Sequence, residues 1–346
     1  MTKILLTGGA GYIGSHTLLK LLMADYDVVT IDNLSNSSYE VINRIKFLAK
    51  KNFDFIEGDI CDKSVLKKIF IKYKIDTVIH FAGLKSSSES NEMPLKYYKN
   101  NVVGSLNLFN EMANNGVNKI VFSSSATVYG EPEIRKCKEN SVLSPISVYG
   151  KSKLLIENIL QDIKNAQPEW RIFNLRYFNP IGAHPSGVIG EDPRNIPNNL
   201  FPFLTQVAIG KREQLLVFGD TYDTCDGTGK RDYIHVEDLA FGHIAALTNI
   251  DKARDTNINV NLGTGRSYSV MEIIRAFEQC SGKKIPFKIV GKRSGDISEL
   301  YADISLAKKI LGWEAKFNIF DMCKDAWRWQ QMNPEGFINV NKFNSE

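Results

Sequence analysis

The sequence predicts an α/β fold, in which a doubly wound parallel sheet is followed by a smaller C-terminal α/β substrate lobe. Three observations lead to this prediction. Six short runs of β-branched and other apolar residues alternate with helical stretches over the first half of the chain. Strands that alternate with helices form parallel sheets with right-handed crossovers. The first strand leads directly into a glycine-rich turn, and after residue 179 the alternation gives way to long loops.

The elements of the sheet follow from local patterns. A buried strand is a run of about four to eight apolar residues, whereas a helix is longer and has apolar positions three or four apart. The expected strands lie at residues 4–7, 27–32, 53–57, 76–81, 119–123 and 171–177. The expected helices lie at residues 12–23, 39–50, 63–73, 95–115 and 148–165. Ligands of such a sheet bind at the carboxyl ends of its strands.

The pattern changes after Asn179. Residues 179–199 are rich in Pro, Gly and Asn, which suits a long functional loop. A helix at 200–209, a strand at 215–218, a loop at 219–230 and a buried strand at 258–262 follow. We expect a nucleotide-binding domain at 1–180, a substrate lobe at 181–335 and a polar tail at 336–346, with segments near 234–265 returning to the first sheet.

Composition argues against several classes of function. The net charge is only +4 and the lysines are not clustered with aromatic residues, so nucleic-acid binding is not indicated. No run approaches the ~20 apolar residues of a membrane span, and no secretion signal is visible. The five cysteines are far apart and lack metal-ligand spacing, which favours a reducing compartment and no metal site. We expect a soluble, cytoplasmic protein.

The turn after the first strand has the spacing of a dinucleotide-binding loop. Residues 8–14 read Gly-Gly-Ala-Gly-Tyr-Ile-Gly and precede an expected helix. Glycines let the backbone approach a pyrophosphate, whose charge the helix N-terminus attracts. Asp32 ends the second strand, where an acid binds the adenosine ribose and disfavours a 2′-phosphate, so NAD is preferred over NADP. A glycine turn that binds nothing is the alternative.

Two further strand ends are candidates for cofactor contacts. Asp59 and Ile60 follow the third strand, where they suit an adenine contact, although an Asp without this role is an equally good interpretation. Phe81, Ala82 and Gly83 follow the fourth strand, where small residues let the backbone approach the cofactor.

Tyr149 and Lys153 are four residues apart, so a helix places them on one face. A phenol beside a fixed ammonium can act as a base, and a cationic nicotinamide ring would favour the phenolate further. Lowering the phenol pKa from ~10 to about 7 takes roughly 4 kcal/mol. Ser125 ends the serine run after the fifth strand and can bind a sugar hydroxyl beside Tyr149. Taken alone, the pair also fits a surface helix and the serines fit a polar turn.

Taken in order, the glycine turn, Asp32, the serine turn and the Tyr149/Lys153 pair resemble the extended short-chain dehydrogenase/reductase family. Longer strings are similar to the UDP-glucose 4-epimerases of that family and cover nearly the whole chain: residues 32–34, 80–85, 176–180, 182–187, 196–200, 227–236 and 262–263. The resemblance implies a Rossmann-type fold, tightly held NAD, a homodimer, and reversible 4-epimerisation of UDP-glucose and UDP-galactose through a 4-keto sugar.

The resemblance also implies residue roles. Tyr149 would take the proton of the sugar 4-hydroxyl, with Ser125 in the proton relay and Lys153 on the nicotinamide ribose. The implied cofactor contacts are Gly8, Gly11, Tyr12, Ile13, Gly14, Asp32, Asn33, Asp59, Ile60, Phe81, Ala82, Gly83, Lys85, Asn101, Tyr149, Lys153 and Phe178. The implied UDP-hexose contacts are Lys85, Ser125, Tyr149, Asn179, Asn199, Leu200, Phe218, Arg231, Arg293, Asp296, Leu300 and Tyr301. Arg231 and Arg293 suit a diphosphate, because guanidinium groups bind phosphate oxygens with paired hydrogen bonds.

Other activities of the same scaffold stay as alternatives. Dehydratases of the family have an Asp-Glu pair where this chain has Ala126 and Thr127, which cannot act as strong acid or base. A reductase would consume NADH, and a non-catalytic NAD-binding sensor can lose the Tyr-Lys pair that this chain retains. Leu300 falls where family members carry either a large Tyr or a small residue, so we expect some turnover of UDP-GlcNAc and UDP-GalNAc. Simple packing of Leu300 in the lobe is the alternative.

Overall fold

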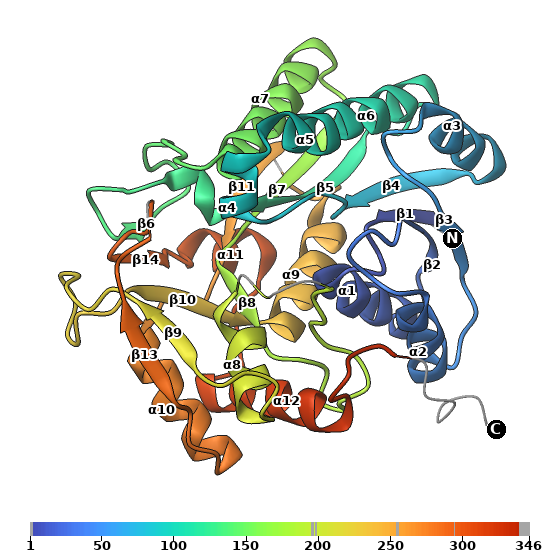
Figure 1. Ribbon diagram of the computed structural model, residues 1–346. Coiled ribbons are helices and arrows are strands. Elements are labelled where there is room, and N and C mark those ends of the chain that lie inside the picture. The colour runs from blue at the N-terminus through green and yellow to red at the C-terminus, as the bar shows by residue number, and fades with distance from the viewer. Residues whose placement is uncertain (1–2, 195–196, 198, 254–255, 294, 339–346) are drawn as a thin grey trace.

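The larger sheet has seven strands among the residues that the computed structural model describes, namely 3–194, 197, 199–253, 256–293 and 295–338. The strand order is β11-β7-β5-β4-β1-β2-β3, and every neighbouring pair is parallel (Figure 1). The strands are β1 (Lys3–Thr7), β2 (Asp27–Asp32), β3 (Asp54–Glu57), β4 (Ile75–His80), β5 (Lys119–Ser125), β7 (Arg171–Tyr177) and β11 (Asn257–Leu262). The order reverses between β1 and β4, and ligands bind at such a point. The predicted fold class is confirmed.

Helices cover both faces of this sheet, because its central strands are buried along nearly their whole length. One face is covered by α1 (Tyr12–Met23), α2 (Tyr39–Ala49), α9 (Val236–Asn249) and α11 (Ser305–Leu311). The other face is covered by α3 (Lys63–Lys72), α6 (Gly104–Asn114) and α7 (Val148–Ala166), which run above the sheet in Figure 1. The start of α7 carries Tyr149 and Lys153.

The smaller lobe, below the large sheet in Figure 1, is built from short strands and helices. Its main sheet has the order β12-β10-β14-β6, β8 also pairs with β10, and β9 pairs with β13. The strands are β6 (Lys136–Cys137), β8 (Asn179–Ile181), β9 (Leu215–Phe218), β10 (Lys230–His235), β12 (Ser267–Ser269), β13 (Phe287–Val290) and β14 (Glu299–Ala302). Helices α8 (Leu200–Ala208), α10 (Val270–Ser281) and α12 (Ile319–Met332) form the lobe's core with them.

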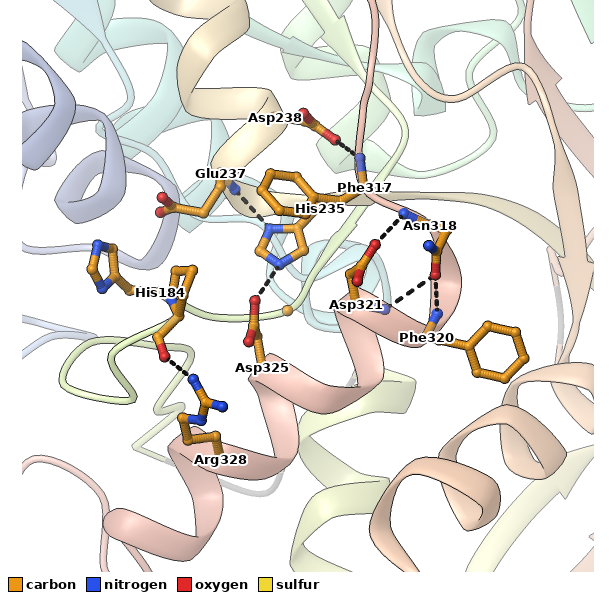
Figure 2. A network of polar contacts seen from close by, with 12 residues as sticks. His184, His235, Glu237, Asp238, Phe317, Asn318, Phe320, Asp321, Asp325 and Arg328 are labelled. Atoms are coloured by element: carbon orange, nitrogen blue, oxygen red, sulfur yellow. Dashed lines mark hydrogen bonds and ion pairs between the residues drawn. The ribbon is translucent and has the colours of Figure 1, made fainter.

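His235 joins the lobe to the large sheet, because it ends β10 and caps α9 (Figure 2). Its Nδ1 accepts a hydrogen bond from the backbone N–H of Glu237 at 3.0 Å. A ring nitrogen that accepts carries no proton, so we assign the proton to Nε2. Nε2 then donates to Asp325 Oδ2 of α12 at 3.3 Å. This buried contact fixes the lobe's last described helix on α9.

The expected helix at 95–115 is interrupted. It consists of α5 (Pro94–Tyr97), a π-helical segment η1 (Tyr98–Val103) and α6, and a short helix α4 (Ser87–Glu92) precedes it. The wider π turn buries the polar side chain of Asn101, which is 1% exposed. Such bulges occur often at functional sites. Of the expected polar tail, residues 339–346 lie outside the described residues.

Candidate active site

The glycine loop fits tightly between three strands. Gly8 adopts φ +74°, and a Cβ there would lie 2.7 Å from the backbone nitrogen of Ala82. Its N–H donates to Ile31 O of β2 at 2.7 Å. A Cβ at Gly14 would lie 2.1 Å from Gly8 O, so only glycine lets the first turn of α1 approach the loop. Gly11 is the N-cap of α1 and brings no side chain to it, which leaves the helix N-terminus available for a pyrophosphate.

Asp32 is oriented by three hydrogen bonds from its surroundings. Its Oδ2 accepts from the backbone N–H of Ala10 at 3.0 Å. Its Oδ1 accepts from Leu34 N at 2.9 Å and from Ser37 Oγ at 3.0 Å. A carboxylate offers about four acceptor positions, so Oδ2 retains one for a ribose hydroxyl. The carboxylate thus faces the loop, as a dinucleotide site requires.

Asn33 and Asp59 meet at the neighbouring strand ends. Asn33 Nδ2 donates to Asp59 Oδ2 at 3.0 Å, and Cys61 N donates to Asp59 Oδ1 at 2.8 Å. Ile60, in contrast, is buried in the core against Gly104. A contact between Ile60 and the cofactor would therefore use its backbone.

Tyr12 and Ile13 belong to the first turn of α1 and are turned into the protein. Tyr12 Oη donates to Gly182 O at 2.7 Å, and burial raises its pKa well above the ordinary value. Ile13 packs against the core that α1 shares with the sheet. The phenol of Tyr12 therefore fixes the glycine loop on the segment after β8.

Lys85 and Asn199 both bind Glu191, a residue that the sequence did not single out. Lys85 Nζ donates to Glu191 Oε1 at 2.7 Å, and Asn199 Nδ2 donates to the same oxygen at 3.2 Å. Asn199 is the N-cap of α8, and Leu200 is its first residue. Glu191 lies in a loop without a motif, so no sequence signal could have identified it.

The turn after β4 lies against Lys153. Asn101 holds this turn, because its Oδ1 accepts from Leu84 N at 2.8 Å and its Nδ2 donates to Leu84 O at 3.0 Å. A Cβ at Gly83 would lie 3.4 Å from Asn101 Oδ1 and 3.7 Å from Lys153 Nζ. The ring of Phe81 points toward α9, where its centroid is 4.6 Å from that of His243.

Ser125 and Tyr149 form the centre of the site. Ser125 Oγ accepts hydrogen bonds from Thr127 N at 3.2 Å and from Thr127 Oγ1 at 2.9 Å. The proton of Ser125 is therefore left to donate elsewhere, and its hydrogen bond to Tyr149 favours the phenolate. Ser147 caps α7 through Gly150 N at 3.1 Å, so Tyr149 begins the helix at a fixed position.

Lys153 is 4% exposed, and its Nζ donates to Ser123 O at 2.7 Å. Burial lowers the pKa of Lys153 to about 7, while the charge of Glu157 acts in the opposite direction. We expected Lys153 to lower the pKa of Tyr149. In this arrangement burial raises the pKa of Tyr149, and only the bond with Ser125 opposes it. A positively charged ring beside the phenol would act in the expected direction.

A buried polar network supports these groups, and sequence analysis did not identify it. Glu157, one turn after Lys153, accepts from Ser124 Oγ at 2.5 Å. Glu157 also accepts hydrogen bonds from Arg176 Nε at 3.0 Å and from Arg176 Nη2 at 2.7 Å. Arg176 in turn donates to Tyr129 Oη at 3.1 Å. A Glu eight residues after a helical Tyr is the weak signal that was available.

A group of cationic and aromatic side chains lies on the smaller lobe. The guanidinium of Arg293 lies 4.4 Å from the ring centroid of Phe218, and its Nε donates to Asp296 at 2.9 Å. Arg231 donates to Ile297 O at 2.8 Å, and in the register of β10 and β14 it pairs with Leu300. Phosphate oxygens are the natural ligands of two adjacent guanidinium groups.

Leu300 and Tyr301 lie on opposite faces of β14, as successive strand residues do. Leu300 is 6% exposed and packs in one apolar cluster with Ala126 and Phe178. Ala126 directly follows Ser125, so Leu300 belongs to the apolar cluster that adjoins this end of β5. Asn179 is exposed at the start of β8.

Comparison with known proteins identifies the family. Residues 4–263 match the NAD dependent epimerase/dehydratase family. The chain belongs to this family. A UDP-glucose 4-epimerase from Yersinia enterocolitica is 55% identical over 97% of this chain and 99% of its own. One from Dictyostelium discoideum is 53% identical over 97% of both chains.

A solved structure leads to the same family. The crystal structure of UDP-glucose 4-epimerase from Bifidobacterium longum, in complex with NAD+ and UDP, superposes with a TM-score of 0.94. It is 47% identical to this chain and covers 97% of it, and the match extends over 100% of that structure's chain. The predicted family and the NAD cofactor are thereby confirmed. The tight glycine cradle and the oriented Asp32 fit a dinucleotide, as this NAD-dependent epimerase/dehydratase fold requires.

The described part of the chain shows neither a metal-binding cluster nor a membrane-spanning helix. Within it, no group of three or more His, Cys, Asp or Glu side chains is arranged to hold a metal ion. No helix there combines the length and apolar character that crossing a bilayer demands.

Proposed function

We propose that this protein interconverts UDP-glucose and UDP-galactose by reversible epimerisation at carbon 4 of the sugar, with NAD bound throughout. The observation that carries the proposal is the convergence of Ser125, Tyr149 and Lys153 at the crevice of an NAD-binding fold. The names of relatives more than 50% identical to the chain support the choice of substrate.

The residues of the chain supply proton transfer and positioning. Tyr149 takes the proton of the 4-hydroxyl as the carbon–hydrogen bond breaks, and Ser125 bridges the two oxygens. Lys153, fixed on the β5 backbone, holds the nicotinamide ribose and keeps a positive charge near the phenolate. When bound, NAD would supply a reversible hydride acceptor for carbon 4. Tyr149 then gives the proton back, so the cycle has no net redox change.

Inversion requires the 4-keto sugar to present its other face while the nucleotide stays in place. Phe218, Arg231, Arg293 and Asp296 form the group that suits this anchor, because they lie near one another on the lobe. Elimination is not supported, since Thr127 is engaged with Ser125 and Ala126 is apolar. This arrangement favours the epimerase over the dehydratase.

We further propose that UDP-GlcNAc and UDP-GalNAc are also turned over. Leu300 lies among Ala126 and Phe178, beside the reacting groups. Leucine lacks the ring and hydroxyl of tyrosine, so it leaves more room for a 2-acetamido group. The acetylated sugars are thus expected as secondary substrates.

A homodimer is supported by an apolar face on two adjacent helical segments. Leu95 is 82% exposed, Val103 46% and Leu106 37% along α5, η1 and α6. Leu155 of α7, which packs against α5 and η1, is 41% exposed. A twofold pairing of these helices between two copies of the chain would bury all four of these apolar side chains. Sedimentation should give a dimer, and a Leu95→Glu/Leu155→Glu variant should sediment as a monomer.

A cytoplasmic location is the last part of the proposal. All five cysteines are free thiols, and two of them, Cys137 and Cys323, are buried. Free thiols persist in reducing compartments.

The decisive experiment uses purified protein and UDP-galactose without added cofactor. UDP-glucose should appear, and NAD should be recovered from the denatured protein. Net NADH consumption would instead indicate a reductase, and an accumulating 4-keto product a dehydratase. No conversion by a protein that contains NAD would indicate a sensor.

A further inference from the structure

The hydroxyl of Tyr222 is buried and has no hydrogen-bond partner among the described residues. Tyr222 lies in the loop between β9 and β10, which is closed by Tyr222 N donating to Gly227 O at 2.8 Å. Thr224 N also donates to Tyr222 O at 2.8 Å. The backbone on both sides of the residue is therefore fixed, and the unpaired phenol is not the result of a loose loop. A buried hydroxyl without a partner is costly, which points to a missing ligand.

One cation lies over the ring of Tyr222, and two more are near enough to act on its phenol. Lys292 Nζ lies 4.3 Å from its centroid. Burial and then the charge of Asp296 raise the pKa of Tyr222, and the positive charges of Arg231 and Arg293 act in the opposite direction. Lys292 donates to Thr221 O at 3.0 Å, which holds the loops together. A Cβ at Gly219 would lie 2.9 Å from the ring, so this side of the phenol is closed by backbone.

These neighbours restrict what the hydroxyl can bind. The cations offer donors and no acceptors, and the carboxylate of Asp296, which accepts from Arg293, makes no hydrogen bond with the phenol. The site has three positive charges against one negative charge. A phenol O–H needs an acceptor, and a ligand that enters among these cations must be an anion.

We propose that Tyr222 Oη donates a hydrogen bond to a phosphate oxygen of the substrate's nucleoside diphosphate, between Arg231 and Arg293. This inference rests on the proposed function, because it places the UDP moiety on this face of the lobe. Tyr222 is a binding residue and not a catalytic one: it holds the end of the substrate that stays fixed while the sugar turns.

The test is calorimetric titration of UDP into the NAD-containing protein. Tyr222→Phe keeps the ring and removes the donor, so it should raise the Kd of UDP about tenfold or more, as for loss of a hydrogen bond to a charged group. KM for UDP-galactose should rise in parallel, while kcat changes by less than about twofold. Tyr26→Phe, which alters a partly buried tyrosine just before β2 at the amino end of the sheet, is the matched control and should leave Kd unchanged.

An unchanged Kd in Tyr222→Phe, with wild-type melting temperature, would overturn this inference and leave the epimerase proposal intact. A fall in kcat without a change in Kd would also overturn it, since a binding residue acts on affinity. Wild-type protein that neither binds UDP nor converts UDP-galactose would overturn both proposals.

Discussion

Lys153 Nζ donates to the carbonyl oxygen of Ser123 at 2.7 Å, two residues before Ser125. The next residue, Ser124, donates to Glu157 at 2.5 Å, and Ser125 lies near enough to Tyr149 to act on its pKa, which burial raises and Ser125 lowers. Three successive residues at the end of β5 are thus joined to three positions on one side of α7. The end of β5 and the start of α7 form one unit. Substitutions in either element should therefore change the positions of Ser125, Tyr149 and Lys153.

Tyr149→Phe should remove the proton acceptor and leave the fold unchanged. A positioned acid–base group contributes about 10²- to 10⁴-fold, so kcat for UDP-galactose should fall by roughly that factor. Steady-state kinetics with a coupled UDP-glucose assay measure this loss. The NAD content of the variant should match the wild type, and undiminished turnover would contradict the proposed mechanism.

Glu157→Gln should destabilise the protein, because it leaves the Arg176 guanidinium buried without its carboxylate. Breaking a buried pair costs about 3–5 kcal/mol, measured here as the free energy of unfolding in urea. The matched control is the double variant Glu157→Gln/Arg176→Met, which removes the unpaired charge and should recover part of the loss. Equal midpoints for wild type and Glu157→Gln would refute this account.

The same substitution should change the pH profile. The charge of Glu157 raises the pKa of Lys153, so its removal lowers that pKa below about 7. Activity that needs the ammonium is lost as pH rises through the pKa of Lys153. The alkaline limb of kcat against pH should therefore move to lower pH in Glu157→Gln, whereas a purely structural effect would lower the whole profile without moving the limb.

Stability should fall between pH 7 and pH 5. Burial lowers the pKa of His16 and His80 to about 3 and of His184 and His243 to about 4. Unfolded histidines bind protons near pH 6.5, so in this window the unfolded state binds more protons than the folded one. Each such histidine contributes up to about 1.4 kcal/mol per pH unit. Asp232, whose pKa burial raises to about 6, acts in the opposite direction, as do Glu139, Asp192 and Asp238, whose pKa burial also raises.

Urea midpoints at constant ionic strength measure this slope. His184→Asn, which replaces a histidine bonded to Ser186, should reduce the slope by about one histidine's share. A midpoint that stays level or rises toward pH 5 would show that the buried imidazoles do not control acid stability.

Leu300→Tyr should narrow the substrate range. A bulkier side chain beside Ala126 and Phe178 should lower kcat/KM for UDP-GalNAc by about tenfold or more relative to UDP-galactose, in the range of a changed pocket contact. The values of kcat/KM for UDP-GalNAc and for UDP-galactose are measured with the same coupled assay. No detectable turnover of UDP-GlcNAc by the wild-type protein would eliminate the dual use of this site.

The predictions from sequence were accurate where one local pattern is sufficient. Buried parallel strands such as β1 and β2 are continuous apolar runs, and the Tyr149/Lys153 spacing identifies one helix face without any distant partner. Asn101 shows the limit: the π turn that buries it depends on bonds to Leu84 and Ser152, which are distant in sequence. Glu191 likewise depends on a distant partner, Lys85, and the ring of Tyr222 lies beneath the distant Lys292, in loops without periodicity.

The strand β6 comes from the segment between Ser125 and Tyr149, yet it pairs with β14 of the lobe. Lys136 and Cys137 face Tyr301 and Ala302 there, next to Leu300. The chain that links Ser125 to Tyr149 is therefore also part of the lobe's sheet, beside the strand that carries Leu300. A hinge between sheet and lobe would therefore have to break or strain the pairing of β6 with β14, so this pairing favours a rigid frame. The rotational freedom that inversion needs then belongs to the substrate, about the bonds between the anchored nucleotide and its sugar.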